Sequence, residues 1–233
     1  MPGDSQRGFF LTFEGLDGSG KTTQIQRLTA WLAERNLPHL VTRQPGGTAT
    51  GDKIRALLLD SKSAGLAPRT ELAMMFADRA QSIQEVIAPA LAAGQIVVCD
   101  RFTDSTEAYQ GGGRELGSEI VLGLHRLICG DIQPDVTVLL LPDLQASVSR
   151  ARRRNIRQIA EAGNDENRFE REQIEFFSRV YLKYREIAQR EPLRVVVIEG
   201  NMTINQVHRQ VINTVEARLE EWQVRYKALV EAR

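Results

Sequence analysis

A glycine-rich segment near the amino terminus has the residue types and spacing of a phosphate-binding loop. It matches the pattern G-x-x-x-x-G-K-[ST] with the residues Gly15, Leu16, Asp17, Gly18, Ser19, Gly20, Lys21 and Thr22. Glycines let successive backbone N–H groups surround a phosphate chain at the positive end of the next helix. The lysine reaches the outer phosphates and the hydroxyl ligates Mg²⁺. Because the segment lies between an expected strand and an expected helix, we predict a nucleoside-triphosphate site; the alternative is an ordinary glycine-rich turn.

Asp17 is the unusual residue of this loop, because a carboxylate inside an anion site would repel a triphosphate. We therefore expect its side chain to point away from the loop and into the neighbouring cleft. There it could accept a hydrogen bond from a substrate hydroxyl. The alternative is a solvated loop acid.

A second pair of candidate residues closes the segment Ile96–Asp100, whose sequence IVVCD is typical of a buried parallel strand. Ligands of open parallel sheets bind beyond the carboxyl ends of the strands. We therefore predict that Asp100 holds a Mg²⁺-bound water, and that Arg101 binds a second phosphate through paired hydrogen bonds. The alternative is a helix-capping aspartate beside a surface arginine.

Other residues of suitable chemistry could converge on the same cleft. Arg43, Arg55 and Arg79 are candidates, although each taken alone is typical of a solvated face. Tyr109, Gln110 and the glycines that follow them combine an aromatic ring, an amide and a flexible backbone. This combination could hold a nucleobase.

The elements that must position these residues are strands alternating with amphipathic helices. Apolar segments predict strands over Phe9–Glu14, His39–Thr42, Ile96–Asp100, Val136–Leu141 and Val195–Glu199. Helical spacing of apolar residues is found over Lys21–Arg35, Asp52–Leu59, Arg69–Ala93 and the last thirty residues. This alternation predicts an α/β fold like that of P-loop NTPases, in which helices cover both faces of a five-stranded parallel sheet to give three layers.

The chain of 233 residues, numbered 1–233, is expected to form a single domain with one lid. We predict a loop over Gln44–Gly51 and an irregular, charged lid over residues 152–168. Thirty basic residues balance thirty acidic ones, so a dedicated nucleic-acid-binding function is not expected. No apolar stretch approaches the roughly 20 residues that a membrane span requires. Cys99 and Cys129 are expected to be buried free thiols in a reducing cytoplasm.

Together, these motifs resemble those of the thymidylate (dTMP) kinases, particularly the bacterial form with a basic lid. The resemblance is carried, in the family's order, by FEGLDGSGKTTQ (13–24), TRQPGGT (42–48), DRFTDSTEAYQGGGR (100–114), the arginines of 150–154 and RFEREQIEFFSRV (168–180). It covers roughly residues 9–215. The resemblance implies transfer of the γ-phosphoryl group of ATP, with Mg²⁺, to the 5′-phosphate of dTMP. The product dTDP supplies dTTP for DNA synthesis, and a cytoplasmic homodimer is implied.

The resemblance also implies roles for individual residues. Asp17 matches the loop acid that binds the sugar 3′-hydroxyl, and Arg101 matches the arginine that holds the monophosphate. Arg79 matches the arginine that hydrogen-bonds the thymine edge. Thr106 and Gln110 take the positions of two further base contacts.

Two more implied roles concern the sugar and the lid. Tyr109 takes the position that guards the 2′ face of the sugar. In the bacterial subgroup the arginine of the transition state comes from the lid, and the phosphate-binding loop here contains no arginine. The lid carries Arg150, Arg152, Arg153 and Arg154, and we assign the catalytic role to Arg153.

Three positions depart from the family's pattern. Gln44 stands where the family has a glutamate. The glutamine keeps a hydrogen-bond acceptor but lacks the negative charge. The segment 140–143 reads LLPD where the family has L-D-x-P. Met75 stands where the family stacks a phenylalanine on thymine, and Phe76 follows it. We expect Met75 to cover the base and Phe76 to belong to the core; the alternative is a locally deformed helix on which Phe76 stacks.

Two other functions fit parts of the sequence. A different nucleotide or nucleoside kinase would share the phosphate-binding loop, although an arginine such as Arg79 favours the O4 acceptor of thymine or uracil over the N4 amino group of cytosine. A P-loop switch or partner-binding ATPase is the second alternative. It would have no use for paired arginines and an aromatic side chain beside the loop.

Overall fold

The structure, a computed structural model of the chain, describes residues 7–60, 63, 65–162, 168–169, 172–199 and 202–231. Its elements in chain order are β1 (Phe10–Glu14), α1 (Lys21–Glu34), β2 (His39–Arg43), α2 (Ala49–Leu59), α3 (Pro68–Ser82), the π-helical turn η3 (Ile83–Ile87), α4 (Ala88–Ala92), β3 (Ile96–Asp100), α5 (Thr103–Thr106), the π-helical segment η4 (Glu107–Gly113), α6 (Ser118–Cys129), β4 (Val136–Leu141), α7 (Leu144–Ala162), α8 (Ile174–Arg190), β5 (Val195–Glu199) and α9 (Ile204–Glu231).

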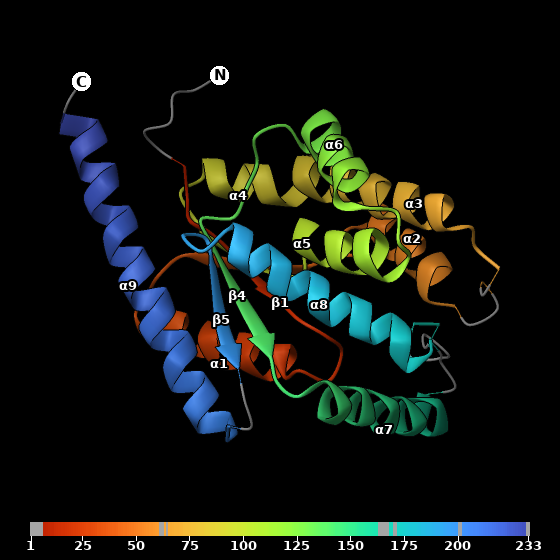
Figure 1. The fold of residues 1–233 in the computed structure, drawn as a ribbon. Coiled ribbons are helices and arrows are strands. Elements are labelled where there is room, and N and C mark those ends of the chain that lie inside the picture. The colour runs from red at the N-terminus through yellow and green to blue at the C-terminus, as the bar shows by residue number, and fades with distance from the viewer. Residues whose placement is uncertain are drawn as a thin grey trace.

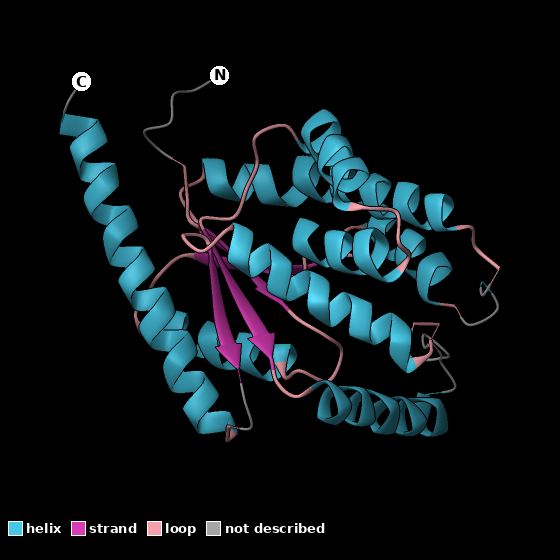
Figure 2. Ribbon diagram, in the orientation of Figure 1, coloured by secondary structure: helices cyan, strands magenta, loops and turns pink. Residues whose placement is uncertain are grey.

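The five strands form one parallel sheet in the order β2-β3-β1-β4-β5. Figure 2 shows the strands in magenta among the surrounding helices. The register places both Phe13 of β1 and Arg43 of β2 beside Asp100 of β3. All three strands therefore end at the same edge of the sheet. This edge brings the phosphate-binding loop, Arg43 and Arg101 close together.

Helices cover both faces of the sheet, and Figure 1 shows α1 and α9 on one side of the strands and α3 to α6 with α8 on the other. Alternate residues of β1 face the two layers. Leu11 packs in one core cluster with Leu28 of α1 and Val215 of α9. Phe10 packs in another with Phe76 of α3. This arrangement confirms the three-layer α/β fold that the sequence predicts.

Two expected boundaries differ in the structure. The loop predicted to reach Gly51 ends earlier, because the Thr48 hydroxyl accepts the Gly51 N–H at 2.8 Å and caps α2, which begins at Ala49. The helix predicted over Arg69–Ala93 is divided into α3, η3 and α4. Pro89 lacks the N–H group that would continue the α-helical hydrogen bonds through this segment.

The prediction of an irregular lid over residues 152–168 is wrong for residues 152–162, which continue helix α7. These residues contain neither glycine nor proline, and they are rich in arginine, glutamine, alanine and glutamate, which favour helices. Their charge indicated surface exposure, which a helix satisfies as well as a loop does. Residues 163–167 lie outside the described residues.

Two further observations concern burial. Cys99 and Cys129 are buried free thiols, as predicted. None of the described helices combines the length and the apolar composition that a membrane crossing requires.

Two adjacent leucines of α2 test how this helix packs against the rest of the protein. Leu58 is fully buried, whereas the side chain of Leu57 is 58% exposed. We expect Leu58→Ala to lower the free energy of unfolding by about 2–5 kcal/mol, because it removes buried apolar contacts and leaves a cavity. Leu57→Ala is the control on the same helix and should change it by about 0.5 kcal/mol or less. Urea denaturation of both variants measures this; equal losses would contradict the packing described here.

Candidate active site

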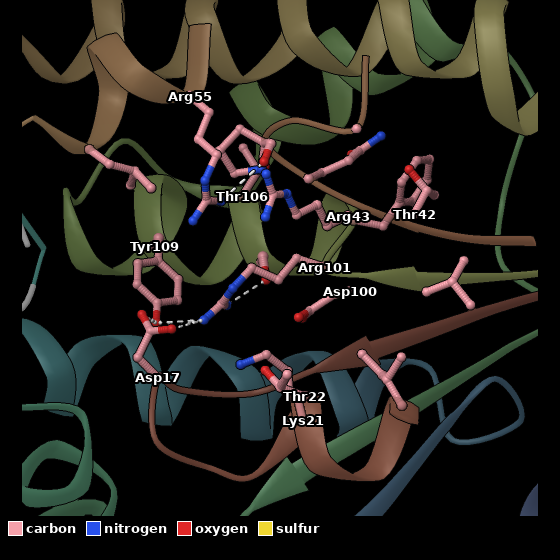
Figure 3. A pocket seen from close by; sticks show the side chains of 18 of the residues that line it. Asp17, Lys21, Thr22, Thr42, Arg43, Arg55, Asp100, Arg101, Thr106 and Tyr109 are labelled. Atoms are coloured by element: carbon pink, nitrogen blue, oxygen red, sulfur yellow. Dashed lines mark hydrogen bonds and ion pairs between the residues drawn. The ribbon is translucent and has the colours of Figure 1, made fainter. Parts of the chain in front are cut away.

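A cavity of about 1220 Å³ opens beyond the carboxyl ends of β1, β2 and β3. Its lining includes these residues predicted from the sequence: Asp17, Gly18, Gly20, Lys21, Thr22, Arg43, Arg55, Met75, Arg79, Asp100, Arg101, Thr106, Tyr109 and Gln110. Figure 3 shows Arg43, Arg55 and Arg101 extending from different elements toward the space above Lys21 and Thr22. Four candidates of the phosphate-binding loop and the base pocket are not in the lining: Gly15, Leu16, Ser19 and Phe76.

The phosphate-binding loop needs glycine at positions where a side chain would collide with β4 or α7. Gly15 has φ 129°, and a Cβ atom there would lie 2.2 Å from the Leu140 carbonyl oxygen. Gly18 has φ 77°, and its Cβ would lie 2.3 Å from the Ser147 carbonyl oxygen. The loop then leads into α1, whose N-cap is Gly20, and Gly20, Lys21 and Thr22 line the cavity. The first N–H groups of a helix have no partner within the helix and suit an anion.

Lys21 is the buried cation of the loop. Its Nζ donates to the carbonyl oxygens of Gly15 at 3.0 Å and Leu16 at 3.1 Å. Burial, and next the positive charge of Arg101, lower its pKa from 10.5 to about 8. An anion bound in the cavity would favour the charged form. The ammonium group is therefore well suited to bind phosphate.

Thr22 and Asp100 supply the oxygen atoms that Mg²⁺ prefers. Asp100 Oδ1 is buried and has no hydrogen-bond partner among the described residues. Both side chains line the same cavity, and Figure 3 shows them near Lys21. A hydroxyl and a carboxylate whose Oδ1 is unpartnered within the described part of the chain, both beside a phosphate-binding loop, fit a Mg²⁺ ion that is also bound by phosphates.

Asp17 and Arg101 connect the loop to the neighbouring part of the cavity. The Asp17 carboxylate points out of the loop, and its Oδ1 accepts from Arg101 Nη2 at 2.8 Å (Figure 3). Tyr109 donates to the other carboxylate oxygen at 3.4 Å, and its ring lies 5.1 Å from the Arg101 guanidinium. Asp17, Arg101 and Tyr109 therefore contact one another in the wall of the cavity.

Glu14 supports Arg101 through Ser105, a role that the sequence analysis did not assign to it. Its buried carboxylate accepts the Phe102 N–H at 2.7 Å, the Tyr184 hydroxyl at 3.2 Å and the Ser105 hydroxyl. Ser105 in turn accepts from Arg101 Nη1 at 2.9 Å. Arg101 itself has φ 71°, a left-handed conformation that costs a non-glycine residue about 1–2 kcal/mol. Bonds on both sides of Arg101 keep this strained backbone in place.

The environment of Glu14 also changes its acidity. Burial first, and then the negative charge of Asp104, raise the pKa of Glu14 from 4.5 to about 7. The folded protein therefore opposes ionisation of this carboxyl group more than the unfolded chain does.

Arg79 of α3 also lines the cavity. Its Nε donates to Gln44 Oε1 at 2.8 Å, and its Nη2 donates to the Thr106 hydroxyl at 2.8 Å and the Phe102 carbonyl oxygen at 3.1 Å. Gln44 therefore retains an acceptor role toward Arg79 although it lacks the family's charge. Within the described part of the chain, Arg79 Nη1 has no hydrogen-bond partner.

Met75 and Phe76 point to different places. Met75 lines the cavity, whereas Phe76 is 1% exposed and packs in the core with Phe10 and Phe102. The Phe76 ring also lies 4.9 Å from the Arg79 guanidinium carbon. Helix α3 continues regularly through both residues.

The basic residues of α7 approach the phosphate-binding loop unequally. Arg150 lines the cavity, and its Nε donates to the Gly18 carbonyl oxygen at 2.8 Å. Arg152 and Arg153 are exposed, and Arg153, which the sequence analysis selected, is not in the cavity lining. The side chain of Arg154 lies outside the described part of the chain.

Two acidic positions acquire local structural roles. Asp143, part of the segment that departs from the family's pattern, accepts the Ala146 N–H at 2.9 Å and caps α7. Asp78 accepts the Gly46 N–H at 2.8 Å and fixes the loop after β2. Nothing in the sequence around Asp78 indicated this contact, because Gly46 is 32 residues away along the chain.

Comparison with known proteins now places the chain. The family model described as thymidylate kinase matches residues 13–211. The chain belongs to the thymidylate kinase family. Thymidylate kinase of Desulfovibrio desulfuricans is 45% identical over 90% of this chain and 96% of that protein, and that of Solidesulfovibrio magneticus is 50% identical over 82% and 90%. A crystal structure of thymidylate kinase from Ehrlichia chaffeensis matches with a TM-score of 0.71 and 34% identity, over 90% of this chain and 99% of that one.

The raised pKa of Glu14 predicts a pH-dependent stability. A carboxyl group with a raised folded pKa contributes stability below pH 4.5, and this contribution is lost as the pH rises to about 7. Each unit of difference between the folded and unfolded pKa values corresponds to about 1.4 kcal/mol, so the loss of stability is roughly 3 kcal/mol. We expect the unfolding free energy of wild type, relative to Glu14→Gln, to fall between pH 5 and pH 8 in urea titrations. Glu175→Gln, at an exposed position, is the control. A constant difference across this range would contradict the assignment.

Proposed function

We propose that this member of the thymidylate kinase family transfers the γ-phosphoryl group of ATP to the 5′-phosphate of dTMP in the cavity described above. The observation that carries the proposal is the Asp17–Arg101 pair, 2.8 Å apart, which connects the phosphate-binding loop to a cavity that Arg79 also lines. A switch or a simple ATPase would need the loop without this second polar group. Membership of the family supports the same reaction.

The donor would bind to the loop and the acceptor to the arginine side of the cavity. The loop amides and Lys21 would hold the triphosphate, and Mg²⁺ bound through Thr22 and Asp100 would neutralise phosphate charge. Arg101 would hold the dTMP phosphate in line with the donor, with Arg43 and Arg55 on the same side of the cavity. Because the acceptor phosphate is already ionised, no general base is required.

The sugar and the base would be held by the residues around Tyr109. Asp17 would accept from the 3′-hydroxyl, and Tyr109 would lie against the 2′ face of the sugar. Met75 would cover the thymine ring. Arg79 Nη1, an unpartnered donor in the described structure, suits the O4 acceptor of thymine, with Thr106 beside it.

The α7 arginines would supply charge to the transferring group. Arg150 already contacts the loop at Gly18, and Arg153 would have to move inward from its exposed position. A cation that acts mainly in the transition state raises turnover more than it raises affinity. Closure of this segment would also exclude water, which could otherwise attack ATP.

We also propose a homodimer, which the resemblance implies. Helix α6 exposes 81% of Leu127 and 40% of Ile128, apolar surface that a second copy of the chain could cover.

The proposed reaction is tested by measuring ADP formation from ATP with dTMP, with dUMP, with dCMP and without an acceptor. We expect formation to depend on an acceptor and to be fastest with dTMP. ADP formation at the same rate without an acceptor would favour a switch or an ATPase, and a preference for dCMP would favour another nucleotide kinase.

Removing the loop cation should abolish most of the turnover. Lys21→Ala removes a preorganised positive charge from the phosphates, which should cost about 10²–10³ in turnover number. Lys53→Ala, at an exposed position of α2 outside the cavity, is the matched control and should be unaffected. Near-normal turnover of a folded Lys21→Ala enzyme would refute the donor site.

Met75 and Phe76 should have separable effects. A thioether on an aromatic ring contributes about 0.3–1.5 kcal/mol, so Met75→Ala should weaken dTMP binding about two- to tenfold. Met75 is only partly buried where it packs against the core, so its loss of stability should be smaller than that of Phe76→Ala. Phe76→Ala should instead lower the unfolding free energy by about 3–5 kcal/mol. Titration calorimetry and urea denaturation measure both. A folded Phe76→Ala enzyme that loses dTMP affinity, while Met75→Ala keeps it, would reverse the assignment.

A further inference from the structure

Beside the cavity, a carboxylate that no motif singled out is surrounded by donors. Glu71 of α3 has no exposed side-chain surface. It accepts from Gln110 Nε2 at 2.7 Å, from Arg168 Nη1 at 2.8 Å and from Arg114 Nη2 at 3.2 Å. A carboxylate between two guanidinium groups acts only as an acceptor.

The acceptor-only character of Glu71 fixes the direction of the Gln110 amide. Gln110 is fully buried in η4 and lines the cavity. Its NH₂ group must face Glu71, because the opposite orientation would bring the amide oxygen against a carboxylate oxygen. Gln110 Oε1 is then the free end, and it is buried with no hydrogen-bond partner among the described residues.

The same pocket carries a donor, Arg79 Nη1, for which the described residues provide no hydrogen-bond partner. Thymine presents an O4 acceptor beside an N3–H donor on its pairing edge, whereas cytosine presents an N4 donor beside an N3 acceptor. The acceptor of Gln110 and the donor of Arg79 are complementary to the first pattern and opposed to the second. A buried polar group left without its partner penalises the wrong base.

We propose that Glu71 is a positioning residue for base selection: it holds the Gln110 amide with its oxygen toward the base, so that the site accepts a base with an N3–H and rejects one with a bare N3. The proposal rests on the proposed function and adds a residue that does not touch the base. Arg114 and Arg168 keep the buried charge of Glu71 compensated.

The discriminating acceptors are dTMP and 5-methyl-dCMP, which share the 5-methyl group and differ only at N3 and at the substituent on C4. We expect Glu71→Gln to lower the ratio of kcat/KM for dTMP to kcat/KM for 5-methyl-dCMP about tenfold. An amide at position 71 can also donate a hydrogen bond, so the Gln110 amide can rotate by about 180° and exchange its oxygen and nitrogen positions. General loss of stability would lower both values together and leave the ratio unchanged. An unchanged ratio in folded Glu71→Gln overturns the proposal.

A double-mutant comparison tests whether Glu71 acts through Gln110. Gln110→Met, nearly isosteric and without a polar end, should lower the same ratio, and adding Glu71→Gln should change it no further. A further fall in the double variant would show that Glu71 acts by another route and would overturn the proposal. Glu172→Gln is the matched control. Glu172 contacts Arg114 at 2.6 Å, and its loss should leave the ratio at the wild-type value.

If Glu71→Gln does not fold, Glu71→Asp replaces it. The shorter carboxylate keeps the charge beside both arginines and withdraws from Gln110 Nε2, so a smaller fall in the ratio is expected, and no fall overturns the proposal. Failure of the proposed function is distinguishable, because wild type would then not phosphorylate dTMP at all.

Discussion

The buried carboxylate of Glu14 accepts hydrogen bonds from three groups, and these bonds keep Arg101 in position. The Phe102 N–H and the Ser105 hydroxyl follow β3, and the Tyr184 hydroxyl comes from α8. Arg101 has a left-handed backbone that costs about 1–2 kcal/mol. Strain of this kind persists only where surrounding contacts determine it. Burying Glu14 is costly as well, and the raised pKa records that cost.

Two residues of the cavity lining, Arg101 and Gln110, are each supported by a buried carboxylate. Glu14 and Glu71 are both fully buried carboxylates that orient a residue of the cavity lining: Glu14 accepts from Ser105, which binds Arg101, and Glu71 accepts from Gln110. Neither would contact the substrate. The 2.8 Å contact of Asp17 with Arg101 joins the phosphate-binding loop to the residue that follows β3. A rigid second layer of this kind lets binding and transition-state groups act without reorganisation.

Local patterns in the sequence predicted the phosphate-binding loop, the strand ends and the residues Asp100 and Arg101 at the cavity, because spacing determines which residues share an edge of a parallel sheet. Thr106 and Met75 of the cavity lining were assigned only through the family resemblance. The roles of Glu14 and Glu71 could not be predicted. Their partners, such as Tyr184 and Arg168, are about 100 residues or more away, and only packing brings them together. The helical form of 152–162 was missed because charge indicates exposure and does not distinguish a surface helix from a loop.

Transfer of the terminal phosphoryl group to a monophosphate in this cavity is tested most directly by isotope labelling. The wild-type protein is incubated with dTMP, Mg²⁺ and ATP whose three terminal γ-oxygens are ¹⁸O, and the products are analysed by mass spectrometry. The account predicts that dTDP carries all three labelled oxygens on its β-phosphorus and that little labelled inorganic phosphate forms. Label found in inorganic phosphate with no labelled dTDP would contradict it.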